Sequence, residues 1–428
     1  MLQTFAEALN YLYGNLPMFQ KVGTAAYKKD LTNALALCNV LGNPQDKLRT
    51  IHVAGTNGKG STSHMMASIL QSAGYKTGLY TSPHLKSFTE RIRVNGQEIE
   101  QQFVVDFTNR MMAECEAIKP SFFEITVAMA FDYFVKQQVD VAVIEVGLGG
   151  RLDSTNIINP ILSLITNIGY DHMDILGNTL PEIAFEKAGI IKQNVPVVIT
   201  ERQTEVERVF KDTAALRNAP LVFAGDHWHC QWNSNATLRV SRGKDIIWDS
   251  MTTALKGNYQ LKNIPGVLMS IQILNDLGWK IEQHHISEGI EHTTELTGLK
   301  GRWQVLSHQP LIICDTAHNE SGVREVMSQL ITLPHKQLYI IWGMVKDKDR
   351  KDILALLPKS ANYYFCQASI PRALNAFKLA EEASAIGLSG KVVPDVNEAL
   401  AQAKIVAGTE DIIFTGGSTF IVAELDIL

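Results

Sequence analysis

The sequence lacks the features that mark membrane, secreted and nucleic-acid-coating proteins. None of its 428 residues fall in a run that approaches the roughly 18 apolar residues of a membrane-spanning helix. The first twenty residues contain no basic segment followed by an apolar core, so we expect no secretion signal. A net charge of −5 gives no excess of positive charge for nucleic acid or an anionic membrane. We therefore expect a cytoplasmic protein without nucleic-acid or membrane partners.

Cysteine is scarce, and its spacing argues against disulfides and zinc. The five cysteines are widely separated, odd in number and form no Cys-x-x-Cys pair, which favours reduced thiols. The stretch His227-Trp-His-Cys230 could suggest a metal site. Because no second group of ligands follows at suitable spacing, we expect a strand with surface histidines there instead.

Two series of strand-like segments divide the chain. Short apolar, β-branched runs alternate with longer helical patterns, which is typical of parallel α/β sheets buried on both faces. A hairpin-like region at 232–250 and a helix-rich stretch at 258–289 interrupt the alternation, and 293–303 is rich in turns. We expect one domain at 1–296 and another at 297–428. The strand-like runs are 50–55, 139–147, 161–169 and 195–200, then 310–315, 337–344, 362–367 and 411–417.

The stretch IHVAGTNGKGST, residues 51–62, resembles a phosphate-binding loop but departs from the common spelling G-x-x-x-x-G-K-[ST]. Val53 occupies the first glycine position, and Gly60 separates Lys59 from Ser61. The physical requirements are nevertheless present, because glycines, a lysine and a helix beginning near Ser61 follow a strand in the required order. The alternative is a glycine turn with a solvated lysine. We expect an amphipathic helix at 63–74 to complete the unit.

Two other motifs do not indicate nucleotide binding. Residues 147–150, GLGG, would need glycine at position 152 for a dinucleotide fingerprint, and Leu152 stands there. Residues 346–349, KDKD, lack the asparagine of the guanine-binding motif of GTPases.

A series of motifs in one order resembles the Mur-ligase superfamily, and within it the bifunctional bacterial branch of folylpolyglutamate synthases and dihydrofolate synthases. The motifs are AGTNGKGS, YTSPHL, ERIRVNG, EVGLGGRLDSTN, DHMDILG, EKAGIIK, NYQLKN, KGRWQ, CDTAHN, GMVKDKD and FTGGSTF. The resemblance covers nearly the whole chain. It implies an α/β protein with a P-loop ATPase domain of Mur-ligase type that also binds folate, followed by a smaller Rossmann-like glutamate-ligase domain.

The resemblance also implies an activity. Such ligases use ATP and Mg²⁺ to convert a carboxylate into an acyl phosphate, which the amine of L-glutamate then attacks. The expected acceptors are dihydropteroate and reduced folates, and the expected state is a monomer. Alternatives are a monofunctional folylpolyglutamate synthase, another Mur-type ligase, or a nucleotide-binding regulator without catalysis. A peptidoglycan ligase would need a uridine-nucleotide domain, for which the 54 residues before Gly55 are too few.

Site residues follow by matching motif positions. ATP would be bound by Gly55, Thr56, Asn57, Gly58, Lys59, Gly60, Ser61, Asn263, Arg302 and Asp315. The metal ligands would be Ser82, Glu145, His172 and a carbamylated Lys187. The catalytic set would be Lys59, Glu145, His172, Lys187 and His318, and the folate set Phe122, Phe123, Leu152, Asp153 and Ser154.

Several of these positions have structural alternatives. Glu145 could form a buried ion pair, and Lys187 could pair with Glu186 or Glu182 on a helix. Phe122 and Phe123 could be core residues, and Ser61 could be a helix N-cap. The polar segment 81–96 is expected to fold over the substrate as a lid. In the second domain, Thr316 and Glu320 depart from the family's DGAHNP motif, and Asn258 and Tyr259 depart from its HQ element.

Overall fold

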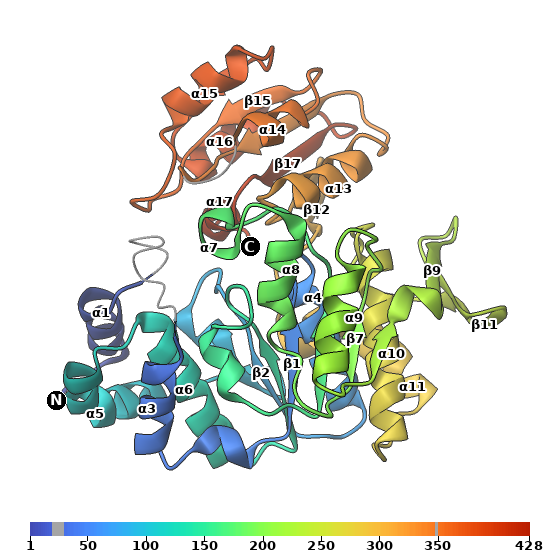
Figure 1. Cartoon of the computed structure of the whole chain (residues 1–428). Helices are drawn as coiled ribbons and strands as arrows, with labels where there is room; N and C mark the ends of the chain where they lie inside the picture. The colour runs from blue at the N-terminus through green and yellow to red at the C-terminus, as the bar shows by residue number, and fades with distance from the viewer. Residues whose placement is uncertain (19–29, 347–349) are drawn as a thin grey trace. The chain divides into compact units, whose positions relative to one another are not determined.

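The computed structural model describes residues 1–18, 30–346 and 350–428, which form two compact units (Figure 1). The first unit comprises Met1–Ala254 and Leu261–Gly298, and the second comprises Leu255–Gln260 and Leu299–Leu428. Most of the KDKD stretch, residues 347–349, lies outside the described residues.

A sheet with the strand order β4-β3-β2-β5-β1-β6-β7-β8 forms the centre of the first unit. From β2 to β8 neighbouring strands are parallel, as the apolar runs predicted, whereas β3 and β4 are antiparallel additions. The central strand β1 lies between β5 and β6. The strands are β1 (Thr50–Ala54), β2 (Thr77–Tyr80), β3 (Ile92–Val94), β4 (Gln97–Glu98), β5 (Val141–Glu145), β6 (Leu162–Ile165), β7 (Val197–Ile199) and β8 (Leu221–Phe223).

Helices cover both faces of this sheet, which explains why its strands are apolar throughout. One face, bearing Ala54, Ile144 and Ile199, packs on α6 and on α8 and α9. The opposite face packs on α4. The helices are α1 (Phe5–Asn15), α3 (Thr32–Val40), α4 (Lys59–Ser72), α5 (Gln101–Ile118), α6 (Phe122–Lys136), α7 (Met173–Leu176), α8 (Leu180–Ala188), α9 (Glu207–Leu216), α10 (Gln260–Asp276), α11 (Gln283–Glu291) and α12 (Thr293–Thr297), with short 3₁₀ turns η2 (Pro44–Lys47), η3 (Phe88–Arg91), η4 (Ser154–Ile157) and η5 (Ala224–Asp226).

The helix after the glycine loop is not amphipathic, so that prediction was wrong. Every residue of α4 from Gly60 to Leu70 is buried, because α11 and α12 pack against its outer side. Gly289 of α11 permits the close approach, since a Cβ there would lie 2.6 Å from Ile69 Cα. The Ser68 hydroxyl donates to the Gly289 carbonyl at 2.7 Å. The serines and threonines of α4 therefore lie inside the unit.

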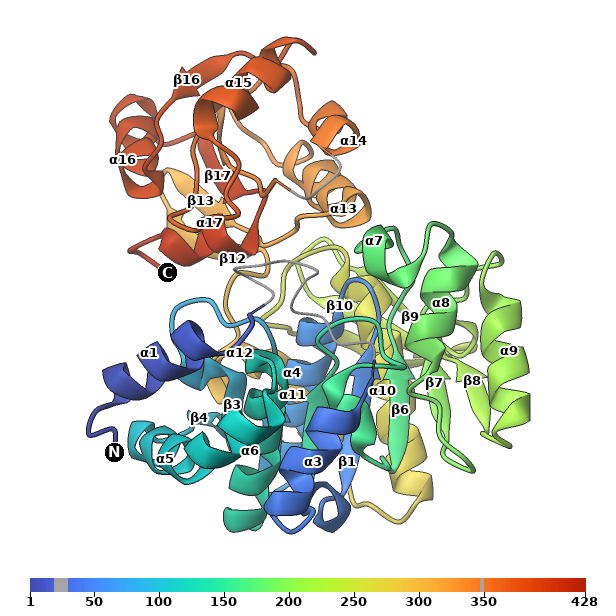
Figure 2. The same cartoon turned by 60° about the vertical axis from the view of Figure 1, so that its left-hand side comes forward.

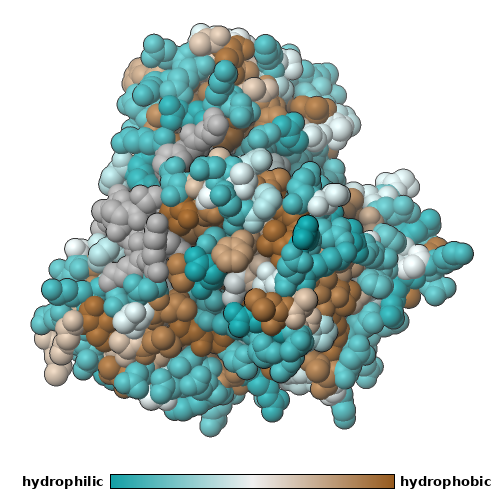
Figure 3. All heavy atoms as spheres, in the orientation of Figure 1, coloured by the Kyte–Doolittle hydropathy of each residue, from teal (hydrophilic) through white to brown (hydrophobic). Residues whose placement is uncertain are grey.

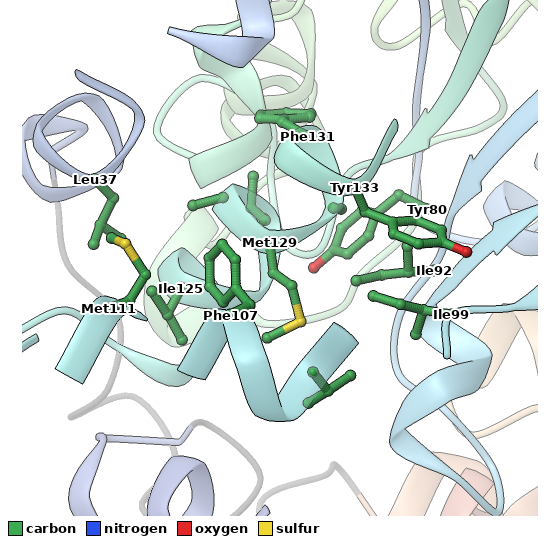
Figure 4. Close-up of a cluster of buried hydrophobic side chains, with 14 of the residues drawn as sticks. Leu37, Tyr80, Ile92, Ile99, Phe107, Met111, Ile125, Met129, Phe131 and Tyr133 are labelled. Atoms are coloured by element: carbon green, nitrogen blue, oxygen red, sulfur yellow. The ribbon is translucent and has the colours of Figure 1, made fainter. Parts of the chain in front are cut away.

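A large apolar cluster joins α1, α3, α5 and α6 to the sheet (Figure 4). Tyr80 and Ile92, labelled there, belong to β2 and β3. Ile92 and Phe88 are 0% and 1% exposed, respectively, so the second half of the segment 81–96 is part of the fold. The prediction of a polar lid is therefore wrong for residues 88–94.

A small antiparallel sheet follows the first, with the order β11-β10-β9. Its strands are β9 (Trp228–Trp232), β10 (Leu238–Arg242) and β11 (Asp245–Met251), which confirms the expected hairpin region. His227 and His229 are exposed, and the described residues contain no group of three or more His, Cys, Asp or Glu side chains that could hold a metal. The interpretation as a strand with surface histidines is confirmed for residues 228–230, whereas His227 lies at the end of η5.

The second unit contains a sheet in the order β12-β13-β17-β14-β15-β16, and Figure 2 shows it from another side. All neighbours are parallel except β12 and β13. Helices α13 to α15 pack on one face, and α16 and α17 on the other. The elements are β12 (Gln304–His308), β13 (Leu311–Cys314), α13 (Glu320–Leu330), β14 (Leu338–Trp342), α14 (Arg350–Ala355), β15 (Asn362–Phe365), α15 (Ala376–Ser384), β16 (Gly390–Val392), α16 (Val396–Val406), β17 (Ile412–Gly416) and α17 (Thr419–Glu424).

Hydrophilic residues predominate on the face shown in Figure 3, with apolar residues among them. Within the described ranges, none of the helices is long and apolar enough to cross a membrane. The segment 293–303, expected to be rich in turns, begins with the short helix α12 and continues as irregular chain with bends.

Candidate active site

The turn between β1 and α4 is fastened to the residues that follow β6. The N–H of Thr56 donates to the Asn167 carbonyl at 2.8 Å, and the N–H of Asn57 donates to the Asn167 side-chain oxygen at 2.9 Å. Thr166 Oγ1 donates to the Asn57 carbonyl at 2.5 Å. The Thr56 hydroxyl bonds both the carbonyl and the N–H of Gly169, at 3.2 and 3.0 Å. Because the N–H groups of Thr56 and Asn57 are engaged in this way, an anion would meet the N–H groups further along, where α4 begins.

Helix α4 begins two residues earlier than the sequence predicted. Its N-cap is Gly58, which adopts a left-handed φ of +83°, and Lys59 is its first residue. The first hydrogen bond within the helix runs from Thr62 N to the Gly58 carbonyl, at 2.9 Å. Ser61 therefore lies in the first turn, and its interpretation as the N-cap was wrong. The positive end of the helix dipole points at the loop, which favours bound negative charge there.

The close approach of Asn263 to the loop gives a matched test of its geometry. Gly58 and Gly74 have φ values of +83° and +84°, but only at Gly58 would a Cβ clash, at 2.3 Å from Asn263 Oδ1. We expect Gly74→Ala to lower the free energy of unfolding by about 1 kcal/mol through left-handed strain alone. Gly58→Ala should lower it by about 2–4 kcal/mol, because overpacking adds to that strain.

Urea titrations of the two variants measure this difference. Asn263→Ala should recover part of the loss in Gly58→Ala, because the two sites are coupled through the clash. Equal losses in Gly58→Ala and Gly74→Ala would contradict the contact with Asn263.

Two lysines converge on one carbonyl of the loop. Lys59 Nζ donates to the carbonyls of Gly55 and Thr56 at 3.0 and 3.1 Å, and Lys187 Nζ donates to the Gly55 carbonyl at 2.9 Å. Lys187 lies in the last turn of α8 and is only 4% exposed. Burial and, secondarily, repulsion from Lys59 lower the pKa of Lys187 to about 7. The structure therefore places two lysine amines beside the glycine turn. The Lys187 amine is the one that readily loses its proton, because its pKa is low.

The alternative pairing of Lys187 with a helix neighbour does not occur. Glu186 instead pairs with Arg151, whose Nη2 lies 2.8 Å from Oε1. Glu182 accepts the N–H groups of Asn178 and Thr179 at 2.8 and 3.0 Å, as part of a capping box. Lys187 is thus directed at the glycine turn after β1 and not along its own helix.

Glu145 and Ser82 meet at the carboxyl end of β5. Glu145 is 5% exposed, and its Oε2 accepts the N–H of Ser82 at 3.1 Å. Because β5 neighbours β1, this carboxylate lies at the sheet edge from which the glycine turn leaves, where ligands of parallel sheets bind. His172 is the N-cap of α7 with a φ of +51°, and its side chain is 29% exposed.

The donor set suits a hard divalent cation. Mg²⁺ takes oxygen ligands and commonly combines one or two carboxylates with substrate phosphates and water. In the described residues no cluster of three His, Cys, Asp or Glu side chains forms a complete cage. Glu145, Ser82 and His172 would therefore need the nucleotide phosphates, and a carbamate on Lys187, to complete such a site.

The residues predicted to hold folate lie in two different environments. Phe122 is 3% exposed, and its ring lies 5.3 Å from that of Tyr13 within the apolar cluster, so the structure places it in the core. Phe123 is partly buried and covers Gly147, where a Cβ would lie 2.4 Å from its ring. Leu152 and Ser154 are half-buried.

Asp153 is enclosed by the chain. It is 3% exposed, and its two oxygens accept the N–H groups of Leu148 and Thr155 at 2.8 and 3.0 Å. Burial raises the pKa of Asp153, and these hydrogen bonds oppose the rise. This carboxylate is therefore held by donors of the protein itself, and its contact with folate stays a prediction.

In the second unit, Asp315 follows β13 and organises the surrounding backbone. Its Oδ2 accepts the Tyr259 hydroxyl and the Trp303 N–H, both at 2.7 Å, and its Oδ1 accepts the Ala317 N–H at 2.8 Å. Burial raises the pKa of Asp315, while the Tyr259 hydrogen bond opposes the rise. Three protein donors therefore share a carboxylate expected to bind ribose.

Two further predicted residues lie near Asp315. Arg302 donates to the Thr316 hydroxyl, and His318 Nδ1 lies 3.0 Å from the Thr316 carbonyl. The substituted position of the DGAHNP motif thus contacts both of them.

Sequence reasoning missed Thr166, Asn167 and Tyr259. The polar residues Thr166 and Asn167 directly follow the apolar run of β6, next to β1, so their position at the ligand edge of a parallel sheet was an available signal. Tyr259 had no such signal, because its partner Asp315 lies 56 positions further along the chain.

Comparison with known proteins gives a consistent result over the whole chain. The Mur ligase middle domain matches residues 53–271, and the Mur ligase, glutamate ligase domain matches residues 301–419. The dihydrofolate synthase/folylpolyglutamate synthase of Bacillus subtilis is 33% identical over 442 residues, covering 99% of each chain. The structure of Escherichia coli FolC in complex with DHPP and ADP is 30% identical, with a TM-score of 0.85, and covers 98% of this chain and 96% of that one. A bifunctional folylpolyglutamate synthase/dihydrofolate synthase structure with Mn, AMPPNP and L-glutamate bound is 30% identical, with a TM-score of 0.83, covering 98% and 97%.

Proposed function

The chain belongs to the Mur ligase family, in its dihydrofolate synthase/folylpolyglutamate synthase branch, and we propose that it is an ATP-dependent ligase that adds L-glutamate to dihydropteroate and to reduced folates. The observation that carries the proposal is the convergence of Lys59 and Lys187 on the Gly55 carbonyl, beside the N-terminus of α4. The Lys59 ammonium and the helix dipole at one turn form a site for a polyanion such as a triphosphate, and Lys187, directed at the same carbonyl, is placed beside it to carry a carbamate.

The chemistry begins with activation of an unreactive acid. A carboxylate oxygen of the pterin substrate attacks the γ-phosphorus of ATP, ADP leaves, and an acyl phosphate forms. The N–H groups at the start of α4 and the Lys59 ammonium hold the phosphates in line and offset the charge that develops on them. The neutral glutamate amine then attacks the acyl carbon, inorganic phosphate leaves with the C–O bond electrons, and the proton lost by the amine nitrogen is taken up by the departing phosphate.

A divalent cation fits the carboxyl end of β5. Ser82, Glu145 and His172 would hold it, and Mg²⁺ when bound supplies charge neutralisation to the phosphoryl group. Lys187, whose pKa burial lowers to about 7, is partly neutral at physiological pH, so its amine can capture CO₂. The resulting carbamate would be an anionic ligand and would remove the repulsion between Lys187 and Lys59.

The proposal assigns substrate contacts to residues of each unit. Residues 1–296 would bind ATP phosphates and the pterin acid, with Phe123, Leu152 and Ser154 on the pterin side. Residues 297–428 would be the glutamate-ligase domain, in which Arg302 contacts phosphate, Asp315 the ribose and His318 the phosphate or the incoming glutamate. Asn263 would lie on the adenine side. The cytoplasmic location, the monomeric state and the absence of nucleic-acid and membrane partners stay predictions.

A product assay tests the function. Protein, ATP, Mg²⁺, dihydropteroate and radiolabelled glutamate should yield labelled dihydrofolate, and tetrahydrofolate in place of dihydropteroate should yield its diglutamate form. Labelling of tetrahydrofolate alone would indicate a monofunctional folylpolyglutamate synthase. Labelling of neither would overturn the proposal.

A further inference from the structure

A chain of buried hydrogen bonds connects the central strand to the loop after β5. His52 of β1 lies with Nε2 2.9 Å from Thr155 Oγ1, and that hydroxyl donates to Asp153 Oδ1 at 2.5 Å. Asp153 Oδ2 then accepts the Leu148 N–H at 2.8 Å. His52 and Thr155 are both 0% exposed. We call His52, Thr155 and Asp153 the buried relay.

The Asp153 carboxylate can only accept, and this decides which atom donates in each hydrogen bond of the buried relay. Because the Thr155 hydroxyl gives its proton to a carboxylate, its oxygen must accept from His52, which assigns the ring proton to Nε2. His52 Nδ1 is then an acceptor, and in the described part of the chain this buried atom has no hydrogen-bond partner. Burial lowers the pKa of His52 to about 3, so the ring stays neutral.

The relay ends at the loop that supports Phe123. The Leu148 N–H held by Asp153 follows Gly147, and Gly147 lies against the tip of the Phe123 ring, where a Cβ would lie 2.4 Å from Cζ. Phe123 is in turn 6.2 Å from Tyr80, centroid to centroid. A shift of Asp153 would therefore displace the backbone of Gly147 and Leu148, which contacts Phe123 on the proposed pterin side.

We propose that His52 and Thr155 are positioning residues for the pterin substrate. They fix the Asp153 carboxylate, and through Leu148 they fix the Gly147 backbone, against which the tip of the Phe123 ring lies. This proposal rests on the proposed function. It assigns to a histidine of the strand before the phosphate loop a role in acceptor binding, and not in ATP binding. A purely structural role would instead lower activity toward all substrates together.

Kinetics of Thr155→Val test the relay, because valine keeps the side-chain volume and removes the hydroxyl. We expect the KM for dihydropteroate to rise about tenfold, the effect of losing about one charge-assisted hydrogen bond, with the KM for ATP unchanged. Thr155→Ser keeps the hydroxyl, so its KM for dihydropteroate should equal that of the wild type. Equilibrium binding of dihydropteroate, followed by pterin fluorescence, should weaken by the same factor in Thr155→Val.

A second pair of variants addresses the other end of the relay. His52→Leu should raise the KM for dihydropteroate in the same way. His52→Gln should raise it less, because the glutamine amide can place an N–H close to the position of Nε2 and donate to Thr155. Equal increases in the KM for ATP and for dihydropteroate, or an unchanged KM for dihydropteroate in Thr155→Val, would overturn the relay while leaving the ligase function intact. A wild-type protein that makes no folate product would instead overturn the proposed function.

Discussion

Replacing Lys59 with alanine is expected to lower the rate of ATP-dependent ligation by about 10³-fold, because a preorganised charge beside the transferring phosphoryl group is lost. Lys59 is half-buried, and its amine donates to the carbonyls of Gly55 and Thr56 in its own loop, at 3.0 and 3.1 Å. The fold should therefore survive, with a thermal unfolding midpoint close to that of the wild type. Initial rates of ADP release with saturating dihydropteroate and glutamate measure the effect.

The charge, and not the length of the side chain, should account for this loss. Lys59→Met preserves most of the stem without the ammonium and should be as inactive as Lys59→Ala. If either variant retains full activity, the assignment of the glycine loop as the phosphate site is wrong.

Replacing Lys187 with alanine should also lower the ligation rate by about 10²–10³-fold, and short carboxylic acids should restore part of it. The cavity left by the side chain can admit formate or acetate, whose carboxylate would take the place of the carbamate. Rates of Lys187→Ala with and without these acids, at constant ionic strength, measure the rescue.

A size control accompanies the Lys187 variant. Lys187→Met fills the cavity with an apolar chain, so the same acids should not restore its activity. Wild-type rates in Lys187→Ala would show that this lysine is not needed as a ligand. Loss without rescue in Lys187→Ala, together with normal nucleotide binding, would exclude the carbamate specifically.

Much of the fold was predictable because its strands are buried on both faces. The runs that became β1, β5, β6, β13, β14 and β17 contain little besides apolar residues, and such runs have few alternatives to a covered parallel strand. The glycine turn was predictable for a similar reason, since a strand, glycines, lysine and helix in that order satisfy the requirements of anion binding together.

The burial of α4 could not be predicted from local pattern. Ser63, His64 and Ser68 look like a solvent-facing side of a helix in the sequence. They lie inside because α11 and α12, more than 200 residues later, cover them, and His64 Nδ1 lies 2.8 Å from Thr297 Oγ1. Only tertiary contacts decide between these two readings.

The candidate site shows the same division. Lys59 and the glycines are neighbours in sequence, whereas Lys187 reaches the Gly55 carbonyl from 132 residues away. His52 and Thr155 are 103 residues apart and meet because the turn η4, which follows β5, returns to the side of the sheet on which His52 lies. Neither hydrophobic periodicity nor motif spacing predicts these long-range contacts. The resemblance to a family was needed to suggest Lys187, and only the three-dimensional structure shows the buried relay.

The central claim is that a phosphoryl group passes from ATP to the substrate carboxylate before glutamate reacts. Dihydropteroate labelled with ¹⁸O in both carboxylate oxygens tests it, with mass analysis of the inorganic phosphate released during ligation. The mechanism predicts one ¹⁸O atom in each phosphate, because the C–O bond of the acyl phosphate breaks when the amine attacks. Unlabelled phosphate accompanying labelled dihydrofolate would contradict it.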